Sequence, residues 1–262
     1  MATNLEKLVK KLEKSSLSAE NQLAKVINSL YKKISFRAVL NTYADLITRP
    51  TPQARLDGLG KLLELLDDAT AALIPPPTAV LDQLTDVYVL GVKAAAEMVE
   101  VGTTFGLINP AAVRVARGLI SARLNKFWVG RDAVLSAPTR ALVTRALTTG
   151  AAPKELQKQL EIRLGVSKAR ASKIIRTELA VAQNTGMDTL ITEAAEKADV
   201  KLEKTWRATK DKRTRDSHRK LDGVTVDSDT PFKRGLMHPH DPSAPASEII
   251  NCRCTVTYRR KR

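Results

Sequence analysis

Cysteine, aromatic residues and long apolar runs are all scarce in this sequence. The only two cysteines among 262 residues are Cys252 and Cys254, and a disulfide across one intervening residue would be badly strained. A disulfide framework is therefore excluded, which fits a reducing compartment. Aromatic residues are 4% of the chain, too few for a platform on which nucleic-acid bases stack. No apolar run approaches the roughly 18 residues of a membrane span, and residues 1–14 lack a signal-peptide core, so we expect an intracellular protein without a membrane partner.

Acidic residues are scarce beside basic ones, and the imbalance lies in the second half of the chain. Residues 1–120 hold 14 basic and 12 acidic residues, whereas residues 121–262 hold 29 and 16, which gives most of the net charge of +15. Lysine and arginine placed on phosphates release condensed counterions, so nucleic acid is the first candidate partner; a solvated basic surface without a specific partner is the alternative. We expect non-specific phosphate contacts with double-stranded DNA from Lys210, Lys212, Arg213, Arg219, Lys220, Arg259, Arg260, Lys261 and Arg262.

Residues 1–200 have the apolar periodicity of helices. Apolar side chains recur at steps of three and four over residues 5–12 and again over 23–46, the spacing of one helix face. We expect the first helix to end at Ser15–Ser18 and the second to end at Arg49–Pro52, where proline stops a helix.

Further helix boundaries follow from proline, glycine and capping residues. The segment that starts at Asn109-Pro110 is expected to hold two helices, or one helix kinked at Ala137-Pro138. The helices predicted in this part of the chain cover 53–73, 78–101, 110–147, 153–165 and 167–197.

The last 60 residues have a different composition. Short segments typical of strands occur at Leu202–Ala208, Val224–Val226 and Thr255–Tyr258, separated by turn-forming residues. We therefore expect a mostly α N-terminal region with a small C-terminal α+β domain. The expected boundaries give a helical region at 1–150, a helical connector at 151–200 and the α+β domain with a basic tail at 201–262.

The C-terminal segment also carries a dense polar signature. A domain this small has little apolar core and needs another source of rigidity, and buried polar groups must satisfy one another. We expect the signature to converge in one structural cluster, with Trp206 as its apolar anchor and Arg215 paired with Asp222 or Asp241. The cluster residues are Trp206, Asp211, Arg215, His218, Asp222, Gly223, Asp241, Asn251, Cys252 and Cys254.

The order of these residues resembles a known family. The pattern W-x4-D-x-R-T-R-x-x-H-x-x-L-D-G from Trp206 to Gly223 is followed by D-P-S-A-P at 241–245 and I-N-C-R-C at 250–254. It is similar to the C-terminal signature of phage head morphogenesis proteins related to Mu protein F. The helix with Arg176-Thr177-Glu178, Ala182 and Asn184 resembles the segment just upstream in that family, so the resemblance spans about residues 150–258.

The resemblance implies a structural minor head protein of a tailed bacteriophage rather than an enzyme. Such a protein is associated with the portal, acts in head assembly and in genome packaging or delivery, and contacts DNA. Its implied partners are the portal protein, through residues 1–150, and other head proteins. Its implied location is the interior of the virion head near the portal, in multiple copies, and the host cytoplasm during assembly.

His218, Cys252 and Cys254 are potential zinc ligands, and a closed structural site would need a fourth ligand, His238 or His240. The resemblance implies cysteines at the positions of Arg215 and His218 and a histidine at Ile249, so this chain departs from that pattern. A cation at position 215 would repel Zn²⁺. We therefore expect no cofactor: His218 bonds Asp222 or Asp241, and the thiols are simply buried. The zinc site stays open as the alternative.

The enzymatic interpretations of this sequence have less support than the structural one. His238, His240 and Asn251 resemble in type the residues of small His-metal nucleases, although the expected strand–helix order around them is absent. The resemblance also implies ADP-ribosyl transfer as an alternative, because some phage head proteins of that family are fused to such domains. The Arg-Thr-Glu triplet at 176–178, however, falls in a predicted helix and not on the strand that this chemistry requires, so an interhelical salt bridge is the simpler interpretation. No arrangement typical of a protease occurs. A plain nucleic-acid-binding factor with the basic tail 258–262 is disfavoured by the family resemblance.

Overall fold

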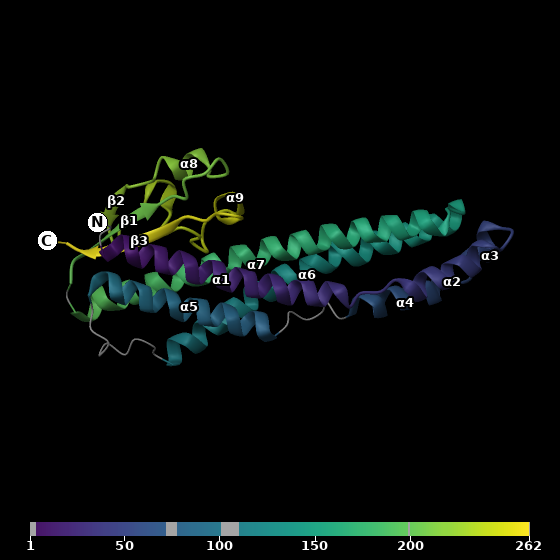
Figure 1. Cartoon of the computed structure of the whole chain (residues 1–262), viewed down its shortest axis with the longest axis horizontal. Coiled ribbons are helices and arrows are strands. Elements are labelled where there is room, and N and C mark those ends of the chain that lie inside the picture. The colour runs from purple at the N-terminus through teal and green to yellow at the C-terminus, as the bar shows by residue number, and fades with distance from the viewer. Residues whose placement is uncertain (1–3, 72–77, 101–109, 199, 262) are drawn as a thin grey trace. The chain divides into compact units, whose positions relative to one another are not determined.

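The computed structural model describes residues 4–71, 78–100, 110–198 and 200–261, without the side chains of residues 4, 127–134 and 198. Seven helices precede the first strand within these ranges, which confirms the expected mostly α chain with a small C-terminal α+β part (Figure 1). The helices are α1 (Asn4–Lys32), α2 (Arg37–Ile47), α3 (Pro52–Leu56), α4 (Leu59–Ala71), α5 (Thr78–Val99), α6 (Pro110–Thr149) and α7 (Pro153–Ala198).

The chain forms two compact units, each built from separate segments. The sheet-bearing unit comprises residues 1–23, 79–122 and 173–262, and the helical unit comprises residues 24–78 and 123–172. Compact units of this kind do not show where an independently folding domain begins. The boundaries expected at residues 150 and 200 therefore stay a prediction.

The helical unit is held by an apolar core. Its buried members are Phe36 with Val39, Tyr43 and Leu46 of α2, Leu62 and Leu66 of α4, Val143, Ala146 and Leu147 of α6, and Leu156 and Leu160 of α7. The hydroxyl of Tyr43 donates to the carbonyl oxygens of Ala151 at 2.6 Å and Ala146 at 3.1 Å. Gly150, with φ of 72°, ends α6 in the left-handed conformation that glycine adopts without penalty.

The helices of the sheet-bearing unit approach closely. Glycines at positions 91 of α5 and 186 of α7 leave no room for a side chain, since a Cβ on Gly91 would overlap the carbonyl oxygen of Gln183. On Gly186 it would overlap the carbonyl oxygen of Tyr88. The N-terminal part of α1 joins these helices through an ion pair of 2.6 Å between Glu20 and Arg176.

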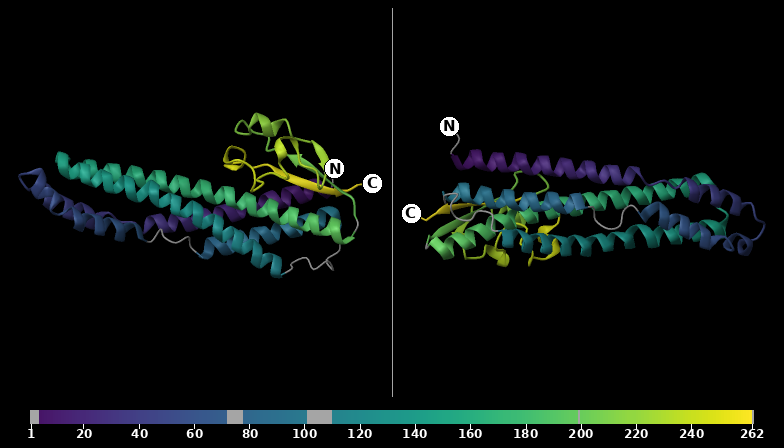
Figure 2. Two further views of the ribbon diagram at one scale, coloured as in Figure 1. Left: turned by 180° about the vertical axis from the view of Figure 1, so that it is seen from behind. Right: turned by 90° about the horizontal axis from the view of Figure 1, so that it is seen from below.

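The sheet has three antiparallel strands in the order β2-β1-β3, namely β2 (Thr225–Asp227), β1 (Leu202–Arg207) and β3 (Thr255–Arg260). The short elements around it are α8 (Asp216–Arg219), the 3₁₀ turn η1 (Lys233–Gly235) and α9 (Ala246–Ile249). Strand β3 lies beside the C-terminal part of α7 (Figure 2). There the Tyr258 hydroxyl donates to Asp188 at 3.3 Å, and the Thr255 hydroxyl donates to Asn184 at 3.4 Å. The three strands expected from composition are therefore confirmed.

Several predicted helix ends are wrong. Helix α1 continues through Ser15–Ser18, where the Ser16 hydroxyl donates to the carbonyl oxygen of Leu12 at 2.9 Å. The break comes instead at residues 33–36. Helix α7 continues through Gly165, and Ser167 is not a cap but a buried partner of the Tyr31 hydroxyl at 2.8 Å.

Two further boundaries are settled by the structure. The segment predicted as one helix from 53 divides into α3 and α4 at residues 57–58. Helix α6 passes Pro138 as one helix, where the hydroxyl of Thr139 donates to the carbonyl oxygen of Ser136 at 2.9 Å. The predicted ends at residues 73 and 101 and the cap at Asn109 lie outside the described residues.

Candidate functional site

Three buried side chains converge beside the sheet: His218 from α8, Cys252 from the segment after α9, and Cys254 from the residue just before β3. The Nδ1 atom of His218 lies 3.3 Å from the Cys252 sulfur and 3.6 Å from the Cys254 sulfur. One ligand atom from each residue lies within 4.8 Å of the other two, and all three residues are at most 4% exposed. We call this group the Cys–His cluster.

A buried carboxylate fixes the histidine ring of the cluster. His218 Nε2 lies 2.8 Å from an oxygen of Glu248, and the other oxygen of Glu248 pairs with Arg234 at 2.9 Å. Because the Nε2–H donates to the carboxylate, Nδ1 is the nitrogen that faces the sulfurs. Trp206 packs its ring edge-on against His218 at a centroid distance of 5.3 Å. The indole is fully buried, so Trp206 is the apolar anchor beside the cluster.

The electrostatics of the cluster favour one thiolate. The hydrogen bond from the Cys252 thiol, aided by His218, lowers the pKa of Cys254 to about 5, although burial opposes the shift. The same hydrogen bond, together with burial, raises the pKa of Cys252. Burial works against the charged form of His218, but the Cys254 sulfur and Glu248 outweigh it and raise the His218 pKa. Thiol, thiolate and imidazolium therefore stabilise one another.

His238 and His240 are buried but lie outside the cluster. The Nε2–H of His240 donates to the carbonyl oxygen of Cys252 at 2.9 Å, and its Nδ1 lies 3.3 Å from the amide nitrogen of Asn184. Burial lowers the pKa of His240 to about 4. The Nδ1–H of His238 donates to the carbonyl of Pro239 at 2.9 Å. Both rings thus fix the proline-rich loop, and neither is placed as the fourth ligand that the sequence suggested.

The remaining residues of the polar signature hold separate turns. Asp222 accepts the backbone N–H of Ala208 at 3.0 Å, and Asp241 accepts those of Met237 and Ser243 at 2.9 and 2.8 Å. Neither carboxylate bonds Arg215 or His218 within the described residues, so the expected pairing was wrong: Arg215 donates to the carbonyl oxygen of Ile250 at 2.5 Å. Each carboxylate is already committed to its own turn, which leaves Glu248 as the partner of His218.

Three more members of the signature are placed by the structure. Asp211 pairs with Arg253 at 2.5 Å, and hydrogen bonding to this guanidinium lowers the pKa of Asp211 to about 2. Gly223 has φ of 79°, in the turn before β2. Asn251 is exposed with φ of 57°, and its backbone N–H donates to the Thr177 hydroxyl at 3.3 Å.

Sequence reasoning missed Glu248 and Arg234. Glu248 lies four residues before Cys252, within the same motif region of the sequence. The property that distinguishes it from the exposed glutamates of the chain is its burial, which only the structure shows. Arg234 has φ of 74° in the 3₁₀ turn, which the sequence did not indicate.

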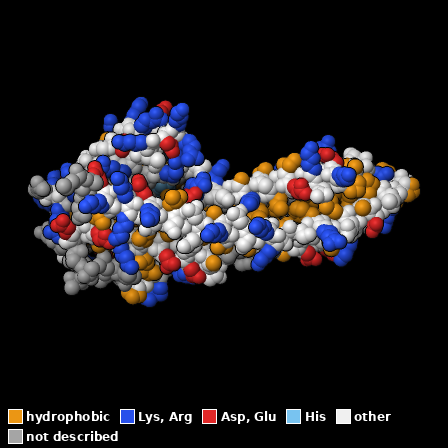
Figure 3. All heavy atoms as spheres, in the orientation of Figure 1, with side chains coloured by type: hydrophobic (Ala, Val, Ile, Leu, Met, Phe, Trp, Pro, Cys, Tyr) orange, Lys and Arg blue, Asp and Glu red, His pale blue; other side chains and the backbone are white. Residues whose placement is uncertain are grey.

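Basic side chains cover the outside of this region. Lys and Arg side chains gather over the part that holds α8 (Figure 3), where the exposed positions are Lys210, Lys212, Arg213, Arg219 and Lys220. Lys212 and Lys220 form no ion pair within the ranges that the structure describes. These five residues are among the nine expected from the sequence to contact DNA, and that role stays a prediction.

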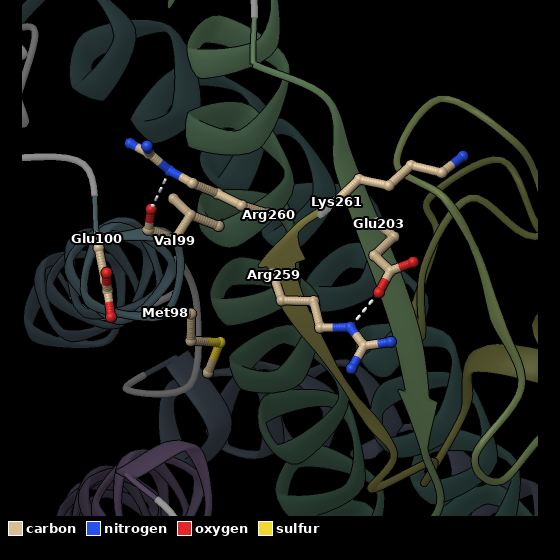
Figure 4. A pocket seen from close by; sticks show the side chains of 7 residues that line it. All are labelled: Met98, Val99, Glu100, Glu203, Arg259, Arg260 and Lys261. Atoms are coloured by element: carbon tan, nitrogen blue, oxygen red, sulfur yellow. Dashed lines mark hydrogen bonds and ion pairs between the residues drawn. The ribbon is translucent and has the colours of Figure 1, made fainter.

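The basic residues of β3 and the tail have other contacts. They line a hollow of about 540 Å³ together with Met98, Val99, Glu100 and Glu203 (Figure 4). Arg259 pairs with Glu203, Arg260 donates to the carbonyl oxygen of Val99 at 2.9 Å, and Lys261 pairs with Asp227 at 2.7 Å. These three side chains are therefore less available to phosphates than those around α8, and Arg262 lies outside the described residues.

Comparisons with known proteins bear on this arrangement. Residues 139–257 match the family model of Phage Mu protein F like proteins. The chain is 27% identical over 265 aligned positions to the Minor head protein GP7 of Bacillus phage SPP1, which covers 95% of this chain and 81% of that protein. It is 32% identical over 155 positions to the NAD(+)--arginine ADP-ribosyltransferase EFV of Enterococcus faecalis (strain ATCC 700802 / V583), covering 57% of this chain.

The second relative is matched only in part. The chain spans 30% of the length of that ADP-ribosyltransferase. No solved structure matches the chain significantly. None of the helices within the described residues has the length and apolar character needed to span a membrane.

Proposed function

Since residues 139–257 match the family model of Phage Mu protein F like proteins, we propose that this protein is a structural minor head protein of a tailed bacteriophage. The observation that carries the proposal is the similarity to a minor head protein over 95% of the chain. The Arg-Thr-Glu helix lies inside the matched family region, and the short antiparallel sheet follows it as the sequence pattern predicts.

The proposed role includes association with the portal, head assembly and genome packaging or delivery. We assign the head contacts to the helical unit, whose visible face gathers hydrophobic side chains (Figure 3). Ile162 and Val166 lie one turn apart on α7, and each is 49% exposed. Apolar side chains exposed as a group are typical of protein interaction sites, which supports a contact with the portal or another head protein.

The experiment that tests this role measures incorporation into heads. We expect the phage that encodes this chain to carry it in purified heads. The double substitution Ile162→Asp and Val166→Asp should reduce its copy number there several-fold, because a charge in an apolar contact must be desolvated. Mass spectrometry of purified heads gives the copy number of the protein relative to the portal.

A matched pair of exposed apolar residues provides the control. Val115 and Leu119 are also one turn apart, 64% and 61% exposed, and belong to α6 in the sheet-bearing unit. The double substitution Val115→Asp and Leu119→Asp should leave incorporation unchanged. Equal loss in both variants would contradict the assignment to the helical unit, and absence of the unmodified protein from heads would reject the head-protein role.

We propose a structural rather than a catalytic role for the polar residues. The nuclease alternative needs an available histidine, whereas His240 is 3% exposed and both its ring nitrogens have partners. Arg176 of the Arg-Thr-Glu triplet pairs with Glu20 within a helix packing contact, which favours the salt-bridge interpretation over ADP-ribosyl transfer.

This proposal gives a direct biochemical expectation. Supercoiled DNA incubated with the protein and Mg²⁺, Mn²⁺ or Zn²⁺ should stay intact, because all three histidines of the chain are buried. Conversion to nicked circles, measured by agarose electrophoresis, that disappears in both His240→Ala and Asn251→Ala would replace the structural interpretation with the nuclease.

A further inference from the structure

Beyond the head role, we propose that His218 Nδ1 and the sulfurs of Cys252 and Cys254 bind one Zn²⁺ ion, with a water molecule as the fourth ligand. Thiolate sulfur and imidazole nitrogen are the donors that zinc prefers in proteins. The three residues are the ones that the structure brings together, and all three are buried. The proposal takes up the zinc alternative that the sequence left open and changes its ligand set, because His238 and His240 are committed elsewhere.

The atomic spacing of the cluster matches a tetrahedral zinc site. With Zn–S bonds of about 2.3 Å and Zn–N bonds of about 2.0–2.1 Å, a tetrahedral angle separates sulfur from nitrogen by roughly 3.6 Å. The observed separations from His218 Nδ1 are 3.3 Å to Cys252 and 3.6 Å to Cys254. The ion would therefore fit between the three ligand atoms with displacements of a few tenths of an ångström.

The surroundings of His218 are those of a metal ligand. A ligating histidine usually donates its other ring N–H to a carboxylate, which fixes the tautomer and strengthens the ligand. Glu248 supplies that carboxylate at 2.8 Å, and Arg234 holds Glu248 in turn. The backbone N–H of Cys254 donates to the Cys252 sulfur at 3.4 Å, a contact that stabilises negative charge on the sulfur.

The negative charges of the site must balance the two positive charges of Zn²⁺ and the positive charge of Arg215. Two thiolates neutralise Zn²⁺, and Glu248 adds a negative charge on the far side of the imidazole. Arg215 opposes the ion, as the sequence suggested, but its guanidinium is held by the carbonyl oxygen of Ile250. We therefore expect a site that binds zinc less tightly than a site with four cysteine ligands.

The ion would link two segments of the small C-terminal region that are distant in the sequence. His218 comes from α8, whereas Cys252 and Cys254 come from the segment between α9 and β3. A shared metal links these two segments directly, and its binding free energy adds to the free energy of folding. A structural metal of this kind is a common source of stability in small folded regions.

The test uses the full chain, stripped of metal under reducing conditions and titrated with Co²⁺ as a spectroscopic substitute for Zn²⁺. We expect a thiolate-to-cobalt charge-transfer band that saturates at one Co²⁺ per chain and is abolished by one equivalent of Zn²⁺. Cys252→Ser and Cys254→Ser should lose the band. Glu248→Gln should keep it with about 10–100-fold weaker binding, because Glu248 only orients a ligand.

His238→Gln provides the matched control, because His238 is equally buried but lies outside the cluster. This variant should bind Co²⁺ as the unmodified chain does. The proposal is overturned if the unmodified chain takes up no Co²⁺ or Zn²⁺ at micromolar concentration, or if the band survives in the Cys252→Ser and Cys254→Ser double variant. The titration of the unmodified chain decides the question even if a cysteine variant fails to fold.

Discussion

Lys204 places an amino group in the interior of the sheet-bearing unit. The side chain is fully buried on β1, and its Nζ has no hydrogen-bond partner among the described residues. The Phe232 ring lies 5.6 Å from Nζ, which gives a cation–π contact. Burial lowers the pKa of Lys204, although the carboxylates of Asp188, Asp229 and Asp241 act in the opposite direction. An unpaired buried cation of this kind costs stability.

We expect Lys204→Met to raise the free energy of unfolding by about 1–3 kcal/mol at neutral pH, because the substitution removes an unsatisfied buried donor while keeping most of the side-chain volume. The pKa of Lys204 is lower in the folded chain than the ordinary value of about 10.4 in the unfolded chain. The unfolded state therefore binds more protons between these two values, so this residue makes stability rise with pH in that window.

Urea unfolding at several pH values between 7 and 10 measures both effects. Lys204→Met should be more stable at pH 7 and should lose the part of the rise with pH that Lys204 causes. Lys201→Met is the control, because Lys201 is exposed just before the same strand and should change stability by about 0.5 kcal/mol or less. A destabilised Lys204→Met would show that the three carboxylates compensate the buried cation fully.

The candidate site was predictable only in its residue types. The sequence places His218, Cys252 and Cys254 in one signature, and the structure brings them together. It could not indicate that Asp222 and Asp241 are used by local backbone N–H groups, because such bonds depend on the turn conformation. The sequence also does not single out Glu248, because its burial depends on how α9 packs and not on the residue types beside it.

At the scale of the elements, the contact between α5 and α7 depends on two glycines. Gly91→Ala and Gly186→Ala should each destabilise the chain by about 1–3 kcal/mol, because the added methyl group overlaps a backbone carbonyl that cannot move without the helix. Thermal unfolding followed by circular dichroism measures the change in midpoint.

Two other helical glycines give the control for this prediction. A Cβ on Gly118 of α6 or Gly165 of α7 would meet nothing within 4 Å. Gly118→Ala and Gly165→Ala should therefore stabilise the chain by about 0.5–1 kcal/mol, since alanine has the higher helix propensity. If all four substitutions moved the midpoint in the same direction, the close packing of α5 on α7 would not determine the result.

Helix existence was easier to predict than helix ends. The apolar periodicity predicts the helical character of residues 1–200, whereas Ser15–Ser18 and Gly165 predict breaks that the structure does not have. Local propensity at these sites is outweighed by tertiary packing, as the buried contact between Ser167 and Tyr31 illustrates. The real break at residues 33–36 has no proline or glycine to mark it.

At the scale of the whole molecule, the charge distribution predicts where DNA would bind. Reversal of the charges around α8, by Lys212→Glu, Arg213→Glu, Arg219→Glu and Lys220→Glu, should weaken duplex binding strongly and flatten its salt dependence. Each lost phosphate contact lowers the slope of log K against log salt by about 0.9. Fluorescence anisotropy over a salt series measures both quantities, and unrelated DNA sequences should give the same affinities.

The control reverses the same amount of charge on α1 at four exposed positions, namely Lys7, Lys10, Lys14 and Lys25. That variant should keep most of the affinity and nearly the same salt slope. If the two variants lose affinity equally, net charge rather than the surface around α8 governs the association, and the assignment of that surface to DNA is wrong.

Because each unit is built from separate segments, the two units are completed at different times during translation. Every segment of the helical unit has been translated once residue 172 is added, whereas the sheet-bearing unit waits for β3 at residues 255–260. Until then β1 can pair only with β2, and the backbone groups of β1 that face β3 stay unpaired. The nascent chain therefore carries its first 23 residues and α5 without the packing of residues 173–262 until late in its synthesis, which exposes apolar surface that a chaperone can bind.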